Sequence, residues 1–332
     1  MTTFVRTSPW IEKYRPAHLN DVISHQHIVE SLRQYIKLKT FPNLILFGPP
    51  GTGKTSLILA CATELFGSNA KICTLEINAS EERGIDVVRS RIIQFVNGKS
   101  TFSWDDTCDK TIKLVILDEA DSMTIDAQIA LKNVIDTYSQ KSRFCLMCNC
   151  IKKIHPLLLS RCIRYRLHPL PKQHTVSRIK KICELENISI DSDALNEILQ
   201  HSHGDMRYAI NVLQSISTAY KHIDLKCINK YLNQIPNDIV TFIIGFMMKH
   251  DVETSYDEII NIIHNNGYSF HELLNQINMK ILLQEEQHKT IQSLESKKRL
   301  SILSGLGKIE HQLFSNVCNR LLIMSLIGLF SA

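Results

Sequence analysis

The segment that most constrains how this chain can fold is residues 48–55, Gly-Pro-Pro-Gly-Thr-Gly-Lys-Thr, which directly follow the apolar stretch 43–47. Glycine and proline let the backbone N–H groups of such a loop surround an anion. A phosphate-binding loop needs a strand before it and a helix after it, and residues 56–65 carry apolar side chains at helical spacing. The run therefore predicts a nucleotide site at a strand-to-helix turn. The alternative is a turn-forming loop that happens to contain a lysine.

The residues of this loop have distinct expected roles. Lys54 reaches the β- and γ-phosphates, and the Thr55 hydroxyl ligates Mg²⁺ at the start of the next helix. The residues expected to line the nucleotide are Gly48, Pro49, Pro50, Gly51, Thr52, Gly53, Lys54, Thr55 and Ser56.

The first half of the chain has the pattern of an α/β domain. Its short apolar runs lie at 43–47, 72–77, 114–117, 144–148 and 163–167, and helical patterns separate most of them. Such alternation predicts a parallel sheet covered by helices, with the ligand at the carboxyl ends of the strands. After residue 168 helical patterns dominate, so we expect an αβα domain over 1–168, a helical domain over 169–234 and an all-α domain over 235–332.

Two carboxylates follow the third apolar run. In a phosphate-loop NTPase, the acid at this strand end holds Mg²⁺ and its neighbour orients or activates the attacking water. Asp118 is assigned to the metal and Glu119 to the water. The alternative is an ordinary helix N-terminus, where acidic residues are favoured by the helix dipole.

Three further polar residues occupy positions near the expected phosphates. Asn149 ends the fourth strand, where it would position water beside the γ-phosphate; it could also simply belong to a turn. Arg161 lies before the fifth strand and could reach the nucleotide of another subunit, unless it is only solvated. Arg207 lies in the first turn of a helix after 204–205 and could contact the γ-phosphate from the second domain.

Composition argues against several other classes of protein. The chain has ten cysteines, but Cys145 and Cys148 lie in an apolar strand-like run, which favours core packing over a zinc site. The most apolar stretch, 321–330, is too short to span a bilayer and predicts a buried helix. The first ten residues lack the apolar centre of a signal peptide, so we expect an intracellular protein. The net charge of +5 permits a polyanionic partner.

Taken together and in order, these motifs resemble those of the small subunits of replication factor C, the clamp loader among the AAA+ ATPases. The resemblance extends over nearly the whole chain, and Ser160-Arg161-Cys162 favours a small subunit because the large one lacks this box. It implies an AAA+ core with a five-stranded parallel sheet, a helical lid and a helical collar, with ATP and Mg²⁺ bound. The matching segments are 10–16, 48–55, 78–86, 117–121, Asn149, 160–162 and 204–207; the first implies that Tyr14, Arg15 and Pro16 lie near the adenine.

The resemblance also implies partners. Members of this family form a nuclear hetero-pentamer with other replication factor C subunits, which grips a sliding clamp of the proliferating cell nuclear antigen type around primer-template DNA. Residues that would contact the DNA phosphates are Arg83, Arg89, Arg91 and Lys132, although ordinary solvated basic residues would look the same. The apolar segment 92–96 either docks the clamp or packs in the core.

The sequence departs from the family pattern at a few positions. Glu81-Glu82 replaces a pair of aspartates, Cys150 replaces a frequent tyrosine, and Lys132-Asn133 replaces a frequent pair of arginines, which puts one basic contact in doubt. Two alternatives stay open: an AAA+ helicase or origin-binding protein, and a subunit that binds ATP structurally while its neighbours hydrolyse it.

Overall fold

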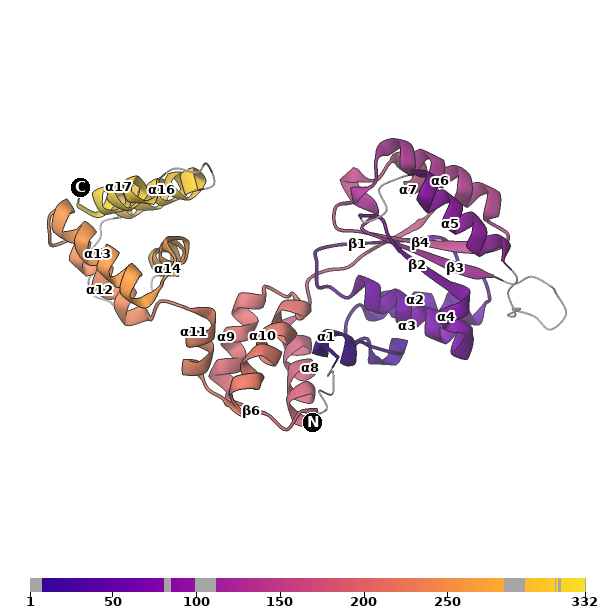
Figure 1. Cartoon of the computed structure of the whole chain (residues 1–332), viewed down its shortest axis with the longest axis horizontal. Coiled ribbons are helices and arrows are strands. Elements are labelled where there is room, and N and C mark those ends of the chain that lie inside the picture. Colours follow the sequence, from indigo (N-terminus) through magenta and orange to yellow (C-terminus); the bar gives the residue numbers. More distant parts are fainter. Residues whose placement is uncertain are drawn as a thin grey trace, which may run out of the picture. The chain divides into compact units, whose positions relative to one another are not determined.

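The computed structural model describes residues 8–80, 85–98, 112–283, 296–313, 315 and 318–331. The chain divides into two compact units, residues 1–223 and 224–332, which are described separately (Figure 1). The predicted domain boundaries at 168/169 and 234/235 stay predictions.

A five-stranded parallel sheet forms the centre of the first unit, as the alternating apolar runs predicted. Its spatial order is β2-β3-β4-β1-β5, so the ends of β3, β4 and β1 are neighbours. The strands are β1 (Leu44–Phe47), β2 (Thr74–Asn78), β3 (Lys113–Asp118), β4 (Ser142–Cys148) and β5 (Ile163–Arg166). The run 72–77 was expected to be entirely strand, but Ala70–Cys73 form the short helix α4, because an apolar run this short does not distinguish a strand from a helix end.

Helices cover both faces of this sheet (Figure 1). One face packs α2 (Gln26–Lys37) and α3 (Lys54–Phe66) against strand residues such as Leu46 and Ile116. The other face packs α5 (Ile85–Asn97), α6 (Ile125–Tyr138) and α7 (Pro156–Leu159) against the alternate strand residues, such as Ile45 and Val115. Successive strand side chains point to opposite faces, so near-continuous apolar strands fill two cores at once.

The rest of the first unit is mainly helical and carries the lid. Its elements are α1 (Trp10–Lys13), α8 (Lys172–Leu185), α9 (Ser192–Ser202), α10 (Met206–Ala219) and the short parallel pair β6 (Ser189–Ile190) and β7 (His222–Ile223). Asp205 caps α10, because its carboxylate accepts the backbone N–H groups of Arg207 at 2.8 Å and Tyr208 at 3.3 Å. His203, in a left-handed conformation, ends α9.

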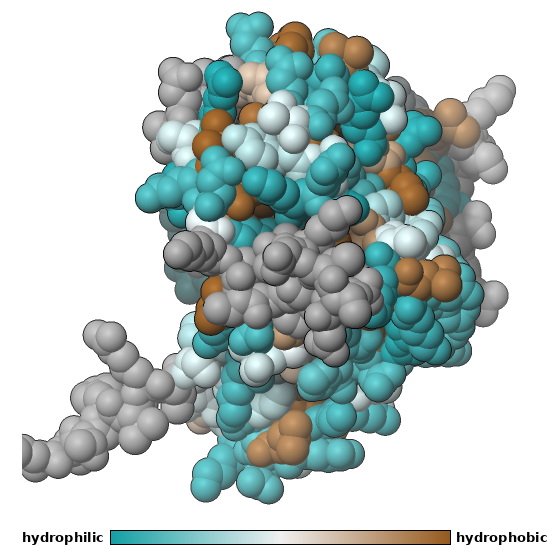
Figure 2. All heavy atoms as spheres, turned by 90° about the vertical axis from the view of Figure 1, so that its right-hand side faces the viewer, coloured by the Kyte–Doolittle hydropathy of each residue, from teal (hydrophilic) through white to brown (hydrophobic). Residues whose placement is uncertain are grey.

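The described residues of the second unit form an all-α structure, and most of its helices share one hydrophobic core. It contains α11 (Leu225–Leu232), α12 (Asn237–Met247), α13 (Val252–Asn266), α14 (Phe270–Leu283), α16 (Ser296–Leu313) and α17 (Asn319–Ser331). The expected buried helix at 321–330 is part of α17, where Leu326 and Ile327 are fully buried. Among the helices of the described residues, none is both long and apolar enough to cross a membrane. The face drawn in Figure 2 is mainly hydrophilic, with hydrophobic residues in small separate groups.

Candidate functional site

The loop between β1 and α3 is packed so closely that two of its positions require glycine. A Cβ on Gly48, whose φ is +151°, would lie 2.1 Å from the carbonyl oxygen of Leu167. A Cβ on Gly51, whose φ is +70°, would lie 1.9 Å from Oδ1 of Asp205 in the lid. The glycines therefore let the loop approach both the end of β5 and the N-terminus of α10.

Lys54 is held at the mouth of this loop. Its Nζ donates to the carbonyl oxygens of Gly48 and Pro49 and to Oδ1 of Asn149, each at 2.9 Å. Burial lowers the pKa of Lys54, while the nearby Asp118 carboxylate acts in the opposite direction and the positive charge of Arg207 adds to the lowering. Because the three hydrogen-bond acceptors are neutral, an anionic phosphate is the partner that this desolvated ammonium would favour.

Two oxygen-bearing side chains meet beside Lys54 in the arrangement expected for a magnesium site. Thr55 Oγ1 donates to Oδ2 of Asp118 at 3.1 Å, which joins the start of α3 to the end of β3. The other carboxylate oxygen accepts the backbone N–H of Glu119 at 2.8 Å. Mg²⁺ prefers hard oxygen ligands of this type, so Thr55 and Asp118 fit the ion. Glu119 follows in a left-handed conformation, with φ of +53°, and its side chain is exposed.

The end of β4 is held by Asp121, a residue for which no separate role was expected. Asp121 Oδ2 accepts the backbone N–H groups of Asn149 at 3.3 Å and Cys150 at 3.1 Å. Asn149 is therefore anchored through its backbone while its side chain contacts Lys54. The signal for Asp121 was present in the acidic segment 117–121, but only the fold shows which strand it supports.

A pocket adjoins the phosphate loop on the side of the lid. It brings together the predicted Tyr14, Arg15 and Pro16 with Ser56 of α3 and Arg207 of α10. The other lining side chains are of two kinds. The apolar ones are Ile11, Val22, Ile23, Leu57, Leu167, Leu170, Met206 and Ile210, and the polar ones outside the phosphate loop are Asp21, Ser24, His25, His174 and Arg178. A largely apolar pocket beside a phosphate loop suits a planar base.

The amino-terminal segment is tied to the lid by two residues that the sequence did not indicate. Glu186 Oε1 accepts from Tyr14 Oη at 2.6 Å and pairs with Lys13 Nζ at 2.7 Å. The hydrogen bond from Lys13 lowers the pKa of Glu186, and the Tyr14 hydroxyl has the same effect. Arg178 donates to the Tyr14 carbonyl oxygen. The lid therefore holds the wall of the pocket.

Comparison with known proteins identifies the family. Three family models match in order: the ATPase family associated with various cellular activities over 44–170, the RCF1/5-like AAA+ ATPase lid domain over 177–218, and the replication factor C C-terminal domain over 235–328. Human replication factor C subunit 5 is 38% identical, over 99% of this chain and 93% of that protein. This chain belongs to the replication factor C family.

Replication factor C subunits of other organisms are similar to this chain over almost its whole length. The probable subunit 5 of Dictyostelium discoideum is 40% identical over 97% of this chain and 90% of its own length. Subunit 3 of Schizosaccharomyces pombe is 36% identical with the same two coverages, 97% and 90%. In sequence, segments 83–89 and 156–162 look most like the third small subunit of the yeast complex, in line with this match to a subunit 3. A solved RuvB variant of Thermotoga maritima matches with a TM-score of 0.55 over 80% of this chain and 92% of that chain; at 15% identity it shows the shared AAA+ fold alone.

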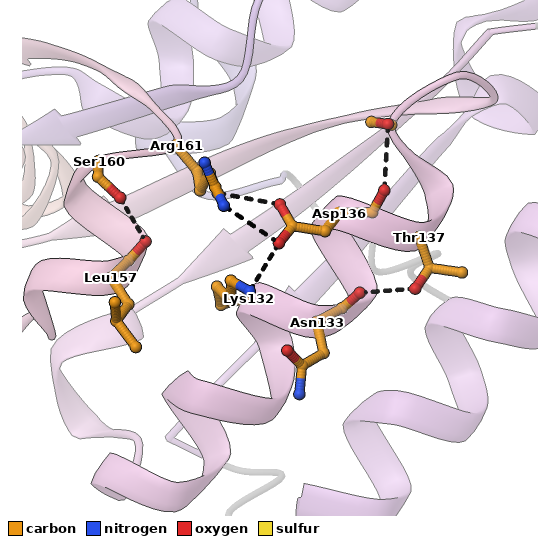
Figure 3. A network of polar contacts seen from close by, with 8 residues as sticks. Lys132, Asn133, Asp136, Thr137, Leu157, Ser160 and Arg161 are labelled. Atoms are coloured by element: carbon orange, nitrogen blue, oxygen red, sulfur yellow. Dashed lines mark hydrogen bonds and ion pairs between the residues drawn. The ribbon is translucent and has the colours of Figure 1, made fainter.

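Arg161, the arginine of segment 160–162, pairs with a carboxylate on α6 of its own chain. Arg161 follows α7, its side chain is 48% exposed, and its Nε lies 3.0 Å from Oδ1 of Asp136 on α6 (Figure 3). Lys132, one turn earlier on α6, lies 2.8 Å from the other carboxylate oxygen. The sequence did not indicate Asp136, which is an ordinary acidic position on a helix.

The other residues expected to face DNA lie on neighbouring helices. Arg89 and Arg91 are exposed on α5, which packs on the same face of the sheet as α6 (Figure 1), whereas Arg83 lies outside the described residues. Ile92 and Val96 are buried in the core, 0% and 4% exposed, so segment 92–96 contributes these side chains to packing rather than to a docking surface. Cys145 and Cys148 are also core residues, and the described residues contain no metal-binding cluster of His, Cys, Asp or Glu.

Proposed function

We propose that this chain is a small subunit of the replication factor C clamp loader, which binds and hydrolyses ATP to open a sliding clamp and load it onto primer-template DNA during replication and repair in the nucleus. One observation carries most of the argument. Lys54, Thr55, Asp118 and Asn149 make direct contacts where β3, β4 and β1 end side by side. This is the place where an open parallel sheet binds its ligand.

ATP would enter with its phosphates on the loop. The backbone N–H groups of 51–53 and the start of α3 provide donors and a favourable helix dipole, and Lys54 replaces neutral acceptors with phosphate oxygens. Tyr14, Arg15 and Pro16 line the pocket for the base. Mg²⁺ held by Thr55 and Asp118 would neutralise phosphate charge.

Hydrolysis requires a positioned water and charge stabilisation. Water attacks the γ-phosphorus as the bond to the bridging oxygen of ADP breaks, and Glu119 accepts the proton of that water. Asn149 orients the water, and Arg207 approaches the γ-phosphate from α10. Arg161 would act on the nucleotide of a neighbouring subunit, since its side chain is directed to α6 in its own chain.

The proposed partners follow from the family. A hetero-pentamer with other replication factor C subunits places Arg161 at an interface, and the proposed ligands of the assembly are a clamp of the proliferating cell nuclear antigen type and primer-template DNA. Arg83, Arg89, Arg91 and Lys132 would contact the DNA backbone, so binding would be independent of sequence and weaken with salt. The match of residues 235–328 to the replication factor C C-terminal domain favours a clamp loader over a helicase or an origin-binding protein.

The trans role of Arg161 is tested by Arg161→Ala in the complex assembled with its replication factor C partners. DNA-stimulated ATP turnover should fall by roughly 10³-fold or more at the affected site, the effect typical of an arginine finger. Arg164→Ala, which removes an exposed arginine three positions away on β5, is the matched control. Unchanged DNA-stimulated turnover in Arg161→Ala would remove the trans role.

A further inference from the structure

One carboxylate on α6, that of Asp136, contacts two basic side chains, Lys132 and Arg161, for which separate functions are proposed. Asp136 Oδ2 contacts Lys132 Nζ at 2.8 Å, while Oδ1 contacts Arg161 Nε at 3.0 Å (Figure 3). Arg161 Nη2 is 3.5 Å from Oδ2, the oxygen that Lys132 already occupies. The contact that Lys132 makes is therefore the shorter one on the shared oxygen.

The contact sets the direction of the Arg161 guanidinium. Asp136 engages the edge formed by Nε and Nη2, which is the side-on arrangement. A guanidinium has five donors in a rigid fork, so the edge that carries Nη1 is left to bind a second anion such as a phosphoryl group. A carboxylate on one edge thus orients the other edge instead of blocking it.

The two elements that carry this contact are held in a fixed register. Buried Gln128 of α6 donates to the carbonyl oxygens of Met123 at 3.2 Å and Lys153 at 3.1 Å, and it accepts the backbone N–H of His155 at 2.6 Å. His155 is the N-cap of α7, which leads into Arg161. Asp136 and Arg161 therefore meet through packed, hydrogen-bonded backbone rather than through a chance encounter of long side chains.

We propose that Asp136 is a positioning residue for Arg161, and that Lys132 competes for the same carboxylate until DNA phosphate draws Lys132 away. The inference rests on the proposed function, in which Arg161 acts in trans and Lys132 contacts DNA. When Lys132 binds a DNA phosphate, Oδ2 becomes available to Arg161 Nη2, and the side-on pair becomes complete. By linkage, anything that completes this pair also favours DNA on Lys132. The hydrogen bond from Lys132 lowers the pKa of Asp136, and the charge of Arg161 adds to the lowering.

The test measures kcat and the half-saturating DNA concentration separately in the assembled complex. Asp136→Asn should lower the DNA-stimulated kcat about 3- to 10-fold, far less than Arg161→Ala, because a half-exposed ion pair orients its partner weakly. The DNA concentration at half-saturation should stay the same or fall, since the carboxylate that competes with DNA phosphate for Lys132 is removed. Lys132→Ala should raise the DNA concentration at half-saturation, because it removes a proposed contact with DNA phosphate. Asp136→Glu should restore most of the kcat.

A double variant separates positioning from a general structural effect. Asp136→Asn combined with Arg161→Ala should be no slower than Arg161→Ala alone, and the melting temperature and ATP affinity of Asp136→Asn should match those of the unmodified chain. An unchanged kcat in Asp136→Asn, or a loss that adds to that of Arg161→Ala, would overturn the inference and leave the proposed function intact. Full turnover in Arg161→Ala would instead overturn the trans role itself, and the inference with it.

Discussion

Gly51→Ala examines the closest approach between the phosphate loop and the lid. The new Cβ would lie 1.9 Å from Oδ1, 2.2 Å from Cγ and 2.9 Å from Cα of Asp205, distances that force the lid to move. Asp205 also caps α10 through the backbone N–H groups of Arg207 and Tyr208, so its displacement weakens that helix start.

The free energy of folding that Gly51→Ala should cost has two parts. The left-handed backbone costs alanine about 1–2 kcal/mol, and crowding of this kind costs about 1–3 kcal/mol more. Gly53→Ala is a matched control, because Gly53 has a φ of +90° but no atom within 4 Å of its Cβ position. For a unit of this size, 1 kcal/mol shifts the melting temperature by about 2–4 °C, so Gly51→Ala should melt roughly 2–12 °C below Gly53→Ala.

Differential scanning calorimetry measures the difference, and added nucleotide identifies the transition of the first unit. Asp205→Gly supplies a second check, since glycine at an N-cap costs only a few tenths of a kcal/mol and removes two of the three close atoms. In that background, the gap between the two alanine variants should narrow. Equal melting temperatures for Gly51→Ala and Gly53→Ala would refute the packing of the loop against Asp205.

Three further predictions concern the phosphate loop, the wall of the base pocket and the core. Lys54→Met should weaken ATP binding roughly 10- to 150-fold with the fold retained, as calorimetric titration would show, because it removes a charged donor to phosphate; unchanged affinity would contradict the assignment. The folded pKa of Glu186 lies below its ordinary 4.5, so its bond to Lys13 stabilises the protein above that pH and is lost as pH falls through the folded value. In urea unfolding, the free energy of unfolding should therefore decrease less steeply with falling pH in Glu186→Gln than in the unmodified chain. Equal slopes in the two proteins would show that the Glu186–Lys13 pair does not stabilise the fold. Ile92→Ala should destabilise the first unit by about 2–5 kcal/mol, whereas Ile72→Ala, at a 61% exposed position, should have little effect; similar effects would contradict the core placement of Ile92.

The order of motifs along the chain predicted much of the fold and of the ATP site. A strand, a glycine-rich turn and a helix must follow one another around Lys54, and parallel strands bring their carboxyl ends to one edge, so Asp118 and Asn149 were expected beside it. The structure confirms the sheet and brings these residues together.

The contacts that the sequence did not predict join residues that are far apart in the chain and that belong to no recognisable motif. Glu186 lies 172 positions from Tyr14, and Asp136 lies 25 positions from Arg161. An acidic residue on an amphipathic helix reads as a solvated position, and only tertiary packing selects its partner. For segment 92–96 the residue type was noticed but the environment was not predicted, because an apolar run alone does not distinguish a docking surface from a core.

We infer that this chain hydrolyses the ATP bound at its own phosphate loop. Glu119→Gln in the assembled complex is the decisive variant, with ATP binding at that site and total turnover measured in the presence of DNA and clamp. ATP should bind this site with normal affinity and stay unhydrolysed there, and total turnover should fall. Turnover identical to that of the unmodified complex would instead indicate a subunit that only binds ATP.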